Sequence, residues 1–199
     1  MVIQMSETQR QKQKTLTRKK LIDTALSLFA QKGLTTTRTA DIAKATGVSH
    51  GTIFVHFPTQ EELLSSVIEE FGIRIAARLH ELADKRCSLQ DVLKSHLSGL
   101  MEFEEFYTRL VIERRLLPEC ARDTYIMIQS IISHHINIAA QIEIQNGTIR
   151  NIPVHLLYNT WIGIVHYYIS NSDLFAPGES VIKRYGEELI VHFLNLIKV

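Results

Sequence analysis

The sequence predicts an all-α protein with a small N-terminal group of three helices and a larger helical C-terminal part, about nine helices in all. Apolar residues recur at every third or fourth position through most of the chain, which is the period of a helix that buries one face. Only four prolines and nine glycines interrupt the 199 residues, of which 45% are hydrophobic and 22% are charged. This composition is that of a globular protein long enough to bury a substantial core.

The first helix is expected from about Thr17 to Lys32, where one apolar stripe runs along the chain. The stripe consists of Leu21, Ile22, Ala25, Leu28 and Phe29. Gly33 is expected to end this helix, because glycine readily takes the left-handed conformation found just after helix C-termini. Residues 1–14 are polar and rich in lysine and glutamine, and we predict that they form a disordered basic arm.

The stretch 37–57 predicts two short helices joined by a tight turn. Ile42 and Ala43 mark the first of them, Gly47 suits the turn, and Ser49 stands where the second helix needs an N-cap. The apolar positions of the second helix are Ile53, Phe54 and Phe57. A helix, a glycine-containing turn and a helix make up the helix-turn-helix unit, whose second helix can enter the major groove of DNA.

Charge is divided unevenly along the chain. Residues 1–58 carry nine Lys or Arg against three Asp or Glu, a net charge of +6, so the remaining residues carry −5. A positive head on an acidic body fits a module that binds a polyanion, joined to a part that does not. A solvated lysine-rich surface is the alternative interpretation.

We divide the chain into the arm (1–14), a helix-turn-helix DNA-binding domain (15–60) and a ligand-binding and dimerisation domain (61–199). In the last domain the helix predicted from Pro153 to Ser170 is apolar around most of its circumference, so it must be buried on more than one side. A twofold homodimer through this helix and the C-terminal one would bury it, and a central place in a large monomeric core is the alternative. The residues expected at the dimer interface are Leu157, Trp161, Ile164, Val165, Tyr168, Ile182, Tyr185, Leu189 and Phe193.

Residues 17–64 carry a known pattern in order and spacing. Its members are Leu21, Ile22, Ala25, Leu28, Phe29, Gly33, Thr37, Asp41, Ile42, Ala43, Gly47, Val48, Ser49, Gly51, Thr52, Phe57, Glu62, Leu63 and Leu64. With these residues the head resembles the TetR family of bacterial transcription regulators, and the rest of the chain resembles the family in helix layout alone. The resemblance implies a dimer, most often a repressor, that binds an inverted-repeat operator in double-stranded DNA and is released by a small-molecule effector.

The DNA contacts are expected from the second and third helices. Thr52 offers a hydroxyl to a base edge or a phosphate and a methyl group to thymine, and Gly51 lets the helix approach the duplex closely. Thr37, which is also the expected N-cap of the second helix, and Thr39 are candidates for phosphate contact aided by the helix dipole. An ordinary cap or surface residue is the alternative in each case. The full set is Thr37, Thr39, Lys44, Ser49, His50, Gly51, Thr52, Phe54 and His56.

Two positions depart from the family pattern. The family usually has tyrosine at the position of Phe54 and commonly has lysine at that of Gln60. Those polar groups would touch DNA phosphates, and each lost ionic contact lowers the salt dependence of binding by about 1. The basic arm with Arg18, Lys19 and Lys44 is expected to restore the electrostatic attraction.

The resemblance also implies a ligand cavity among the helices from about residue 60 to residue 170, mostly apolar with few polar anchors. Arg114 and Arg115 could bind an anionic group of a ligand, and the alternative is that they form a solvated basic turn. For the aromatic candidates, the alternative is packing in the core without ligand contact. The candidates are His96, Met101, Phe103, Tyr107, Arg114, Tyr125, Met127, Gln129, Trp161 and His166.

No catalytic site, metal site or cofactor is predicted. The adjacent His134 and His135 point in different directions on a helix, and His155 and His166 are about three turns apart, too far to share an ion. The sequence has no glycine-rich phosphate loop and no nucleophile elbow. An effector-independent regulator controlled by a protein partner or by concentration is the first alternative, and a helical enzyme is the alternative of another class.

The chain begins without an apolar segment of signal-peptide length, and no apolar run approaches the roughly 20 residues that span a bilayer. We therefore expect a cytoplasmic protein with no membrane contact.

Overall fold

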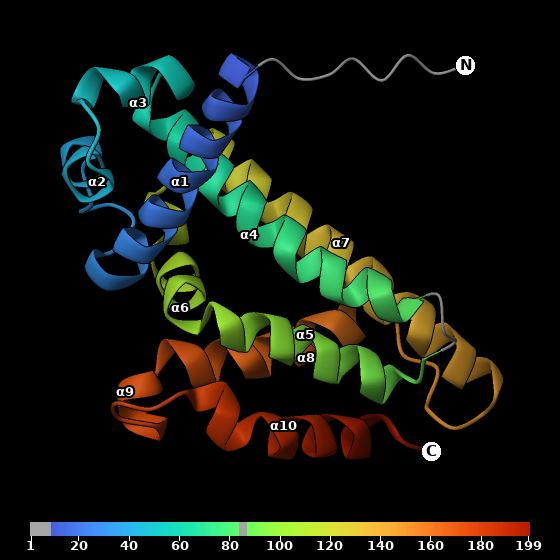
Figure 1. The fold of residues 1–199 in the computed structure, drawn as a ribbon. Coiled ribbons are helices and arrows are strands. Elements are labelled where there is room, and N and C mark those ends of the chain that lie inside the picture. Colours follow the sequence, from blue (N-terminus) through green and yellow to red (C-terminus); the bar gives the residue numbers. More distant parts are fainter. Residues whose placement is uncertain (1–8, 84–86) are drawn as a thin grey trace, which may run out of the picture.

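The computed structural model describes residues 9–83 and 87–199, without the side chains of 78–83, and these residues form ten α-helices and one short 3-10 helix (Figure 1). The predicted all-α class is confirmed, with ten helices where about nine were expected. The elements are α1 (Gln9–Lys32), α2 (Thr39–Thr46), α3 (His50–His56), α4 (Gln60–Ala83), α5 (Leu89–Glu102), α6 (Glu104–Glu113), η1 (Arg114–Leu116), α7 (Glu119–Gln145), α8 (Val154–Ser170), α9 (Ser172–Phe175) and α10 (Val181–Ile197).

Helices α1 to α3 form the head, at the upper left of Figure 1. Gly47 ends α2 with φ +75° and donates its N–H to the Ala43 carbonyl over 3.0 Å, as a left-handed C-terminal glycine does. Ser49 caps α3, because its hydroxyl accepts the Thr52 N–H over 3.2 Å. Ile53 is fully buried and fixes the inner face of α3 against the head core.

The first helix begins earlier than the sequence analysis predicts. α1 starts at Gln9, so residues 9–14 of the expected disordered arm are helical, and residues 1–8 lie outside the described part. The segment has no Gly or Pro, and its Gln, Lys and Arg residues have favourable helix propensities. The hydroxyls of Thr15 and Thr17 also donate to the carbonyls of Gln11 and Gln13, one turn back.

The N-cap of α2 is Arg38 and not Thr37 as predicted. The Thr37 hydroxyl turns inward and donates to the Gly33 carbonyl over 2.7 Å, and the side chain is fully buried. At the cap, the Asp41 carboxylate accepts the Arg38 N–H over 3.1 Å.

The body is arranged around α4, which runs diagonally from the head to the far end of the molecule with α7 along it (Figure 1). Below them α5, α8 and α10 pack together, while α6 lies between the body and α1. Trp161 of α8 is fully buried at the centre of this packing, with its ring centroid 5.3 Å from that of Phe193 of α10. The body therefore connects directly to the head through α4 and α6.

Two connections of the body contain a short helical turn. η1 directly follows α6, and α9 lies in the connection between α8 and α10. The Glu104 carboxylate accepts the Ser180 hydroxyl over 2.5 Å and the Val181 N–H over 2.6 Å, and so caps the start of α10 from 76 residues away.

Within the described residues, no helix combines the length and apolar character needed to cross a membrane. In the same residues, no three His, Cys, Asp or Glu side chains are grouped closely enough to hold a metal ion.

Candidate functional site

The outer face of α3 is the first candidate site. His50 and Gly51 are exposed in its first turn, and Phe54 follows one turn later with 41% of its surface exposed. The His50 ring contacts the Phe54 ring edge-on, at 5.0 Å between centroids. Thr52 is half-buried, and its hydroxyl lies 2.7 Å from the hydroxyl of Ser49. One face of this short helix thus presents the His50 imidazole, the Phe54 phenyl ring and the Thr52 hydroxyl.

Gly51 has no packing reason within the protein. A Cβ added there would meet only the Ser49 hydroxyl oxygen, at 3.9 Å. Glycine inside a helix costs roughly 1 kcal/mol relative to alanine, so its presence here calls for a cause outside the chain. Close approach of another molecule to the first turn of α3 is such a cause.

The two threonines before α3 are not free to touch a phosphate. Thr37 is fully buried, so the expectation that its side chain contacts DNA is wrong. Thr39 is 7% exposed, and its hydroxyl lies 2.8 Å from Nε2 of His50. It is therefore placed to hold His50 in position instead of contacting a partner directly.

The basic side chains of the head divide into exposed and engaged ones. Lys44 is exposed on α2, whereas Lys20 donates to the Thr46 carbonyl over 2.9 Å, at the C-terminus of that helix. Arg18 lies over the Phe57 ring, 4.9 Å from its centroid, and donates to the Ser66 hydroxyl over 3.2 Å. Of these, Arg18 is close enough to the end of α3 for its charge to act on His56.

His56, at the end of α3, is half-buried, and Nδ1 of its ring is buried without a hydrogen-bond partner among the described residues. Burial lowers the pKa of His56, and the charges of Lys14 and Arg18 lower it further. The ring is therefore favoured in its neutral form, which contributes hydrogen bonding and no positive charge to the face.

The two departures from the family pattern have different surroundings. Phe54 is on the outer face of α3, where an added hydroxyl would reach solvent. The Gln60 amide donates to the Thr37 carbonyl over 3.2 Å, so this side chain joins the start of α4 to the loop before α2. The position expected to carry a cation instead makes an internal contact.

A joint between head and body was missed from the sequence. Glu113, at the end of α6, accepts the Thr35 N–H over 2.9 Å and the Thr35 hydroxyl over 2.8 Å. A Cβ on Gly33, whose φ is +97°, would come within 2.8 Å of the same carboxylate. In the second contact of this kind, Arg74 of α4 bonds to Asp23 of α1 over 2.5 Å.

Four of the ten predicted ligand residues meet in a groove of about 650 Å³ between α7 and α8, which we call the α7–α8 groove. They are Arg114, Tyr125, Gln129 and His166. Four further lining residues were not among the predicted ligand residues, namely Tyr158, Asn159, His134 and His155. Their positions follow from the pairing of α7 with α8, and the sequence gives no local signal for that register.

A chain of polar contacts forms the floor of the α7–α8 groove. The Tyr158 hydroxyl donates to Oε1 of Gln129 over 2.6 Å, and Nε2 of Gln129 donates to the Tyr107 hydroxyl over 3.3 Å. The Tyr107 hydroxyl lies 2.7 Å from Nε2 of His166. Burial, followed by the charge of Arg114, lowers the pKa of His166 to about 4, so this ring is neutral at pH 7. Burial raises the pKa values of all three tyrosines, Tyr107, Tyr125 and Tyr158.

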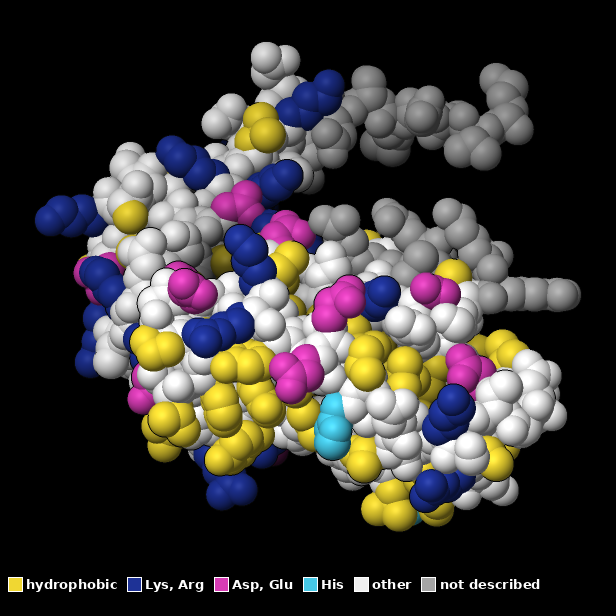
Figure 2. Space-filling model, turned by 90° about the horizontal axis from the view of Figure 1, so that it is seen from below, with side chains coloured by type: hydrophobic (Ala, Val, Ile, Leu, Met, Phe, Trp, Pro, Cys, Tyr) yellow, Lys and Arg dark blue, Asp and Glu magenta, His cyan; other side chains and the backbone are white. Residues whose placement is uncertain are grey.

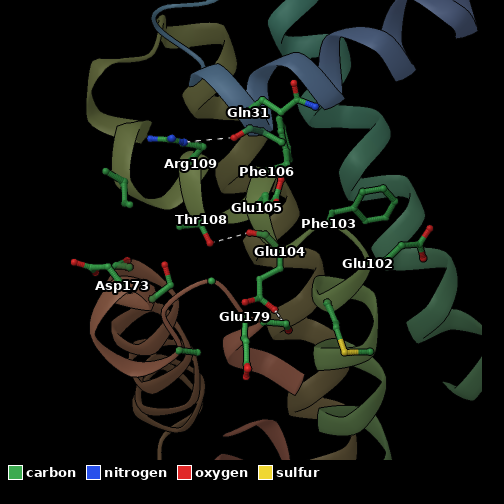
Figure 3. A pocket seen from close by; sticks show the side chains of 18 of the residues that line it. Gln31, Glu102, Phe103, Glu104, Glu105, Phe106, Thr108, Arg109, Asp173 and Glu179 are labelled. Carbon is green, nitrogen blue, oxygen red and sulfur yellow. Dashed lines mark hydrogen bonds between the residues drawn. The ribbon is translucent and has the colours of Figure 1, made fainter. Parts of the chain in front are cut away.

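A second, larger groove of about 1000 Å³ lies where α1 meets the body (Figure 3). The predicted ligand residues Met101 and Phe103 line it. Among its described lining residues, the charged ones are mostly acidic and include a single basic residue, Arg109. They are Glu102, Glu104, Glu105, Arg109, Asp173 and Glu179. We call it the acidic groove.

Tyr107 is buried beneath the α7–α8 groove, where its hydroxyl contacts Gln129 and His166, but it is not among the lining residues. Three further predicted ligand residues line neither groove. His96 and Trp161 are fully buried in the core, where Nε1 of Trp161 donates to Nδ1 of His96 over 3.1 Å. Burial lowers the pKa of His96 to about 3. Met127 is half exposed on α7. These three positions are corrections to the predicted set, because helical spacing alone does not distinguish a core face from a groove.

Most of the predicted dimer residues face the core of their own chain. Leu157, Trp161, Val165, Ile182, Leu189 and Phe193 are buried in the single chain. Of the predicted set, Ile164, Tyr168 and Tyr185 are only partly buried. The exposed apolar side chains of α8 and α10 are others, namely Val154, Leu156, Tyr167, Val191 and Leu196.

A three-helix head with an exposed α3, set on a larger helical body, is the layout of a helix-turn-helix protein. Residues 21–67 match the family model described as bacterial regulatory proteins, tetR family. The chain belongs to the TetR family of transcriptional regulators.

Curated relatives and solved structures agree with this family. The regulator AcrR of Shigella flexneri is 26% identical over 201 residues, which cover 90% of this chain and 88% of AcrR. YuxN of Bacillus subtilis is 29% identical over 60% of this chain, and the repressor Rv3405c of Mycobacterium tuberculosis is 35% identical over 32% of it. The match spans 43% of the length of YuxN and 34% of that of Rv3405c.

The fold is that of FadR from Bacillus subtilis, solved in complex with stearoyl-CoA. The TM-score is 0.73 at 20% identity, over 90% of this chain and 98% of FadR. A TetR-family regulator from Shewanella gives a TM-score of 0.69 at 20% identity, over 92% and 98% of the two chains.

Proposed function

We propose that this protein is a homodimeric repressor that binds an inverted-repeat operator through α3 and is released from it by a small-molecule effector. The observation that carries the proposal is the outer face of α3, where Gly51 leaves the first turn open beside His50 and Thr52. An α-helix presented in this way fits the major groove, in which hydroxyl and imidazole groups can bond to base edges and phosphates. Lys44 and Arg18 supply positive charge around that face.

Dimerisation through α8 and α10 is supported by their exposed faces. Leu156 and Tyr167 of α8 and Val191 of α10 are each more than half exposed in the single chain. Figure 2, which views the molecule from the side of α10, shows hydrophobic side chains gathered in patches on this face. Gly163, in the middle of α8, is exposed, and a Cβ there would meet nothing within 4 Å, so close approach of a second helix accounts for it.

A twofold dimer explains how a helix as short as α3 can recognise a specific DNA sequence. Each head contributes one α3, and two such helices read half-sites one helical turn of DNA, or about 34–36 Å, apart. The operator is then an inverted repeat, because the symmetry of the dimer is imposed on the DNA.

Release by an effector is supported by the two joints between head and body. Arg74 connects α4 to α1 through Asp23, and Glu113 connects α6 to the loop after α1 through Thr35. A ligand that prefers a body conformation with these joints displaced favours a different spacing of the heads. The relatives agree in kind, since Rv3405c is named a repressor and FadR was solved with stearoyl-CoA.

The test is selection of binding sites from random DNA duplexes with the full chain, with Gly51→Gln as the negative control. We expect an enriched inverted repeat with half-site centres about one helical turn apart. Size measurement in solution accompanies it, with Gly163→Gln expected to shift the protein towards the monomer and to weaken operator binding. Recovery of unrelated sequences by the wild-type protein would overturn the proposal.

A further inference from the structure

The two grooves of the body differ in charge. The acidic groove has five carboxylates and one arginine in its lining. The α7–α8 groove contains no Asp or Glu among its described lining residues, and its ionisable groups besides tyrosine are Arg114 and three histidines. A small molecule that carries negative charge therefore meets no repulsion from the lining of the α7–α8 groove.

One hydroxyl in the lining of the α7–α8 groove, that of Tyr125, is buried and can donate a further hydrogen bond. The Tyr158 hydroxyl and the Gln129 amide are already used within the floor. Tyr125 is only 4% exposed, and its hydroxyl, beside that of Tyr107, is buried without a well-formed hydrogen bond. Such a buried hydroxyl costs free energy unless a partner arrives. A ligand that offers acceptor atoms supplies this partner.

Arg114 provides the charge at the same place. It lines the groove from η1, and it lies close enough to both Tyr125 and His166 to influence their ionisation. Its side chain is exposed and forms no ion pair with any described residue. A guanidinium beside a hydroxyl donor matches a carboxylate, which accepts from both.

We propose that the α7–α8 groove binds an organic carboxylate with an apolar body, whose carboxylate contacts Arg114 and accepts a hydrogen bond from Tyr125. The apolar body lies against Ile126, Val154 and Ile162, which line the same groove. A volume of about 650 Å³ suits a ligand of ordinary drug size. The role of this carboxylate as the effector rests on the proposed function, but its binding does not.

The position of Arg114 also connects the ligand to the head. Arg114 directly follows Glu113, whose carboxylate holds the Thr35 N–H and hydroxyl. A carboxylate that draws Arg114 into the groove acts on the same turn of chain that positions the loop between α1 and α2. Binding is thereby coupled to the joint between the two domains.

The acidic groove is the weaker site for a ligand. Its half-buried carboxylate, Glu104, is already engaged as the cap of α10, and the other four acids of the lining, drawn in Figure 3, are exposed. Within the described residues, it holds no buried polar side chain left without a partner. The inference therefore concerns the α7–α8 groove alone.

The experiment titrates the full-length protein by calorimetry with benzoate, 2-naphthoate, octanoate and decanoate, each paired with its primary amide. The amide keeps the shape and removes the charge. We expect at least one acid to bind at least tenfold more tightly than its amide. Arg114→Gln should weaken that acid by about 10- to 100-fold, and Tyr125→Phe by about 3- to 10-fold. The matched controls are Arg115→Gln, an exposed neighbour that does not line the groove, and Tyr167→Phe on the exposed face of α8.

Three results overturn the inference: no acid binds, an acid and its amide bind alike, or Arg115→Gln weakens binding as much as Arg114→Gln does. Operator binding is measured separately on the same samples. If the wild-type protein selects an operator but binds no acid, the inference fails and the proposed function stands. If the acid binds through Arg114 and no operator is found, the carboxylate site stands and the proposed function fails.

Discussion

Polar side chains serve opposite purposes in the head and in the body of this molecule. In the head, His50, Thr52 and Lys44 are directed towards solvent from short helices whose ends are fixed by local caps. In the body, polar groups such as His96 and His166 are directed inward and meet partners from distant helices. The head is arranged to meet a partner from outside, whereas the body keeps a set of neutral, donor-rich groups within its packing.

The difference explains how one chain can separate two kinds of binding. An exposed helix face with flanking cations suits a large, highly charged surface such as DNA, where water is only partly removed. A partly buried groove with a few open donors suits a small molecule that can be surrounded. The joints at Glu113 and Arg74 are where the two arrangements meet.

The largest expected effect is loss of body stability in acid. The pKa values of His96 and His166 are about 3 and about 4 in the folded protein, below the 6.5 of a free histidine. Both rings are thus neutral when folded, and their contribution is fully present above pH 6.5. As the pH falls from 6.5 towards 4, the unfolded chain takes up protons that the folded chain does not, and stability falls by about 1.4 kcal/mol per pH unit for each histidine.

Urea unfolding at pH 7, 6 and 5 measures this loss. His166→Gln should reduce the dependence on pH, because a side chain that can still bond to Tyr107 no longer titrates. His192→Gln, on the exposed face of α10, is the control and should leave the dependence unchanged. Equal effects of the two substitutions would remove the distinction between inward and outward polar groups.

The next effect concerns the head, where Gly51→Gln should separate DNA binding from stability. A long side chain in the first turn of α3 keeps the helix from the groove, and the loss of two base contacts weakens operator binding by about 100-fold or more. The same change replaces a helical glycine and is expected to raise the unfolding free energy by about 0.5–1 kcal/mol.

Fluorescence anisotropy with the selected operator and thermal unfolding give the two readouts. Gly51→Ala is the graded control, with a similar gain in stability and a smaller loss of affinity. A drop in both affinity and stability for Gly51→Gln would mean that the glycine is needed by the fold, contrary to the empty space around it.

Local contacts in the head could be predicted from the sequence, whereas contacts between distant helices could not. Gly47 and Ser49 act on residues three or four positions away, so their roles follow from the local pattern. The contact between Tyr107 and His166 joins residues 59 apart, and that between Glu113 and Thr35 joins residues 78 apart. Such contacts depend on which helices pair and in which register, and helical spacing carries no information about either.

For some residues, the sequence also did not allow burial to be predicted. Thr37 suits an N-cap by residue type, yet its hydroxyl bonds to Gly33, and the cap falls one residue later. Trp161 was assigned to both ligand and dimer contacts, and it is central to the core instead. In each case the residue type predicted the correct helix or helix end. Tertiary packing determined whether the side chain faces the core or the surface.

A smaller effect is expected at the joint. Glu113→Gln keeps one acceptor oxygen but removes the charge that holds two groups of Thr35, so we expect a loss of about 1 kcal/mol in unfolding free energy. Amide hydrogen exchange should become faster in residues 33–46, because the loop before α2 loses its attachment to α6. Glu105→Gln, an exposed position on the same helix, is the control. Unchanged exchange in the head would show that Glu113 does not couple the domains.

The smallest expected effect comes from replacing an internal hydrogen bond of Gln60 by a contact with a DNA phosphate. The Gln60 amide is bonded to the Thr37 carbonyl, at the start of α4. Gln60→Lys should add one phosphate contact per head, so that the plot of log binding constant against log salt concentration steepens by about 1 per head and about 2 per dimer. Gln60→Met loses the same internal bond without adding charge, so its slope should equal that of the wild type.

A steeper slope for the methionine variant would trace the change to the lost bond, and an unchanged slope for lysine would place the start of α4 away from the DNA backbone. Because both variants remove the amide that donates to the Thr37 carbonyl, the difference between them reports the added charge, which is the property that distinguishes the head from the body.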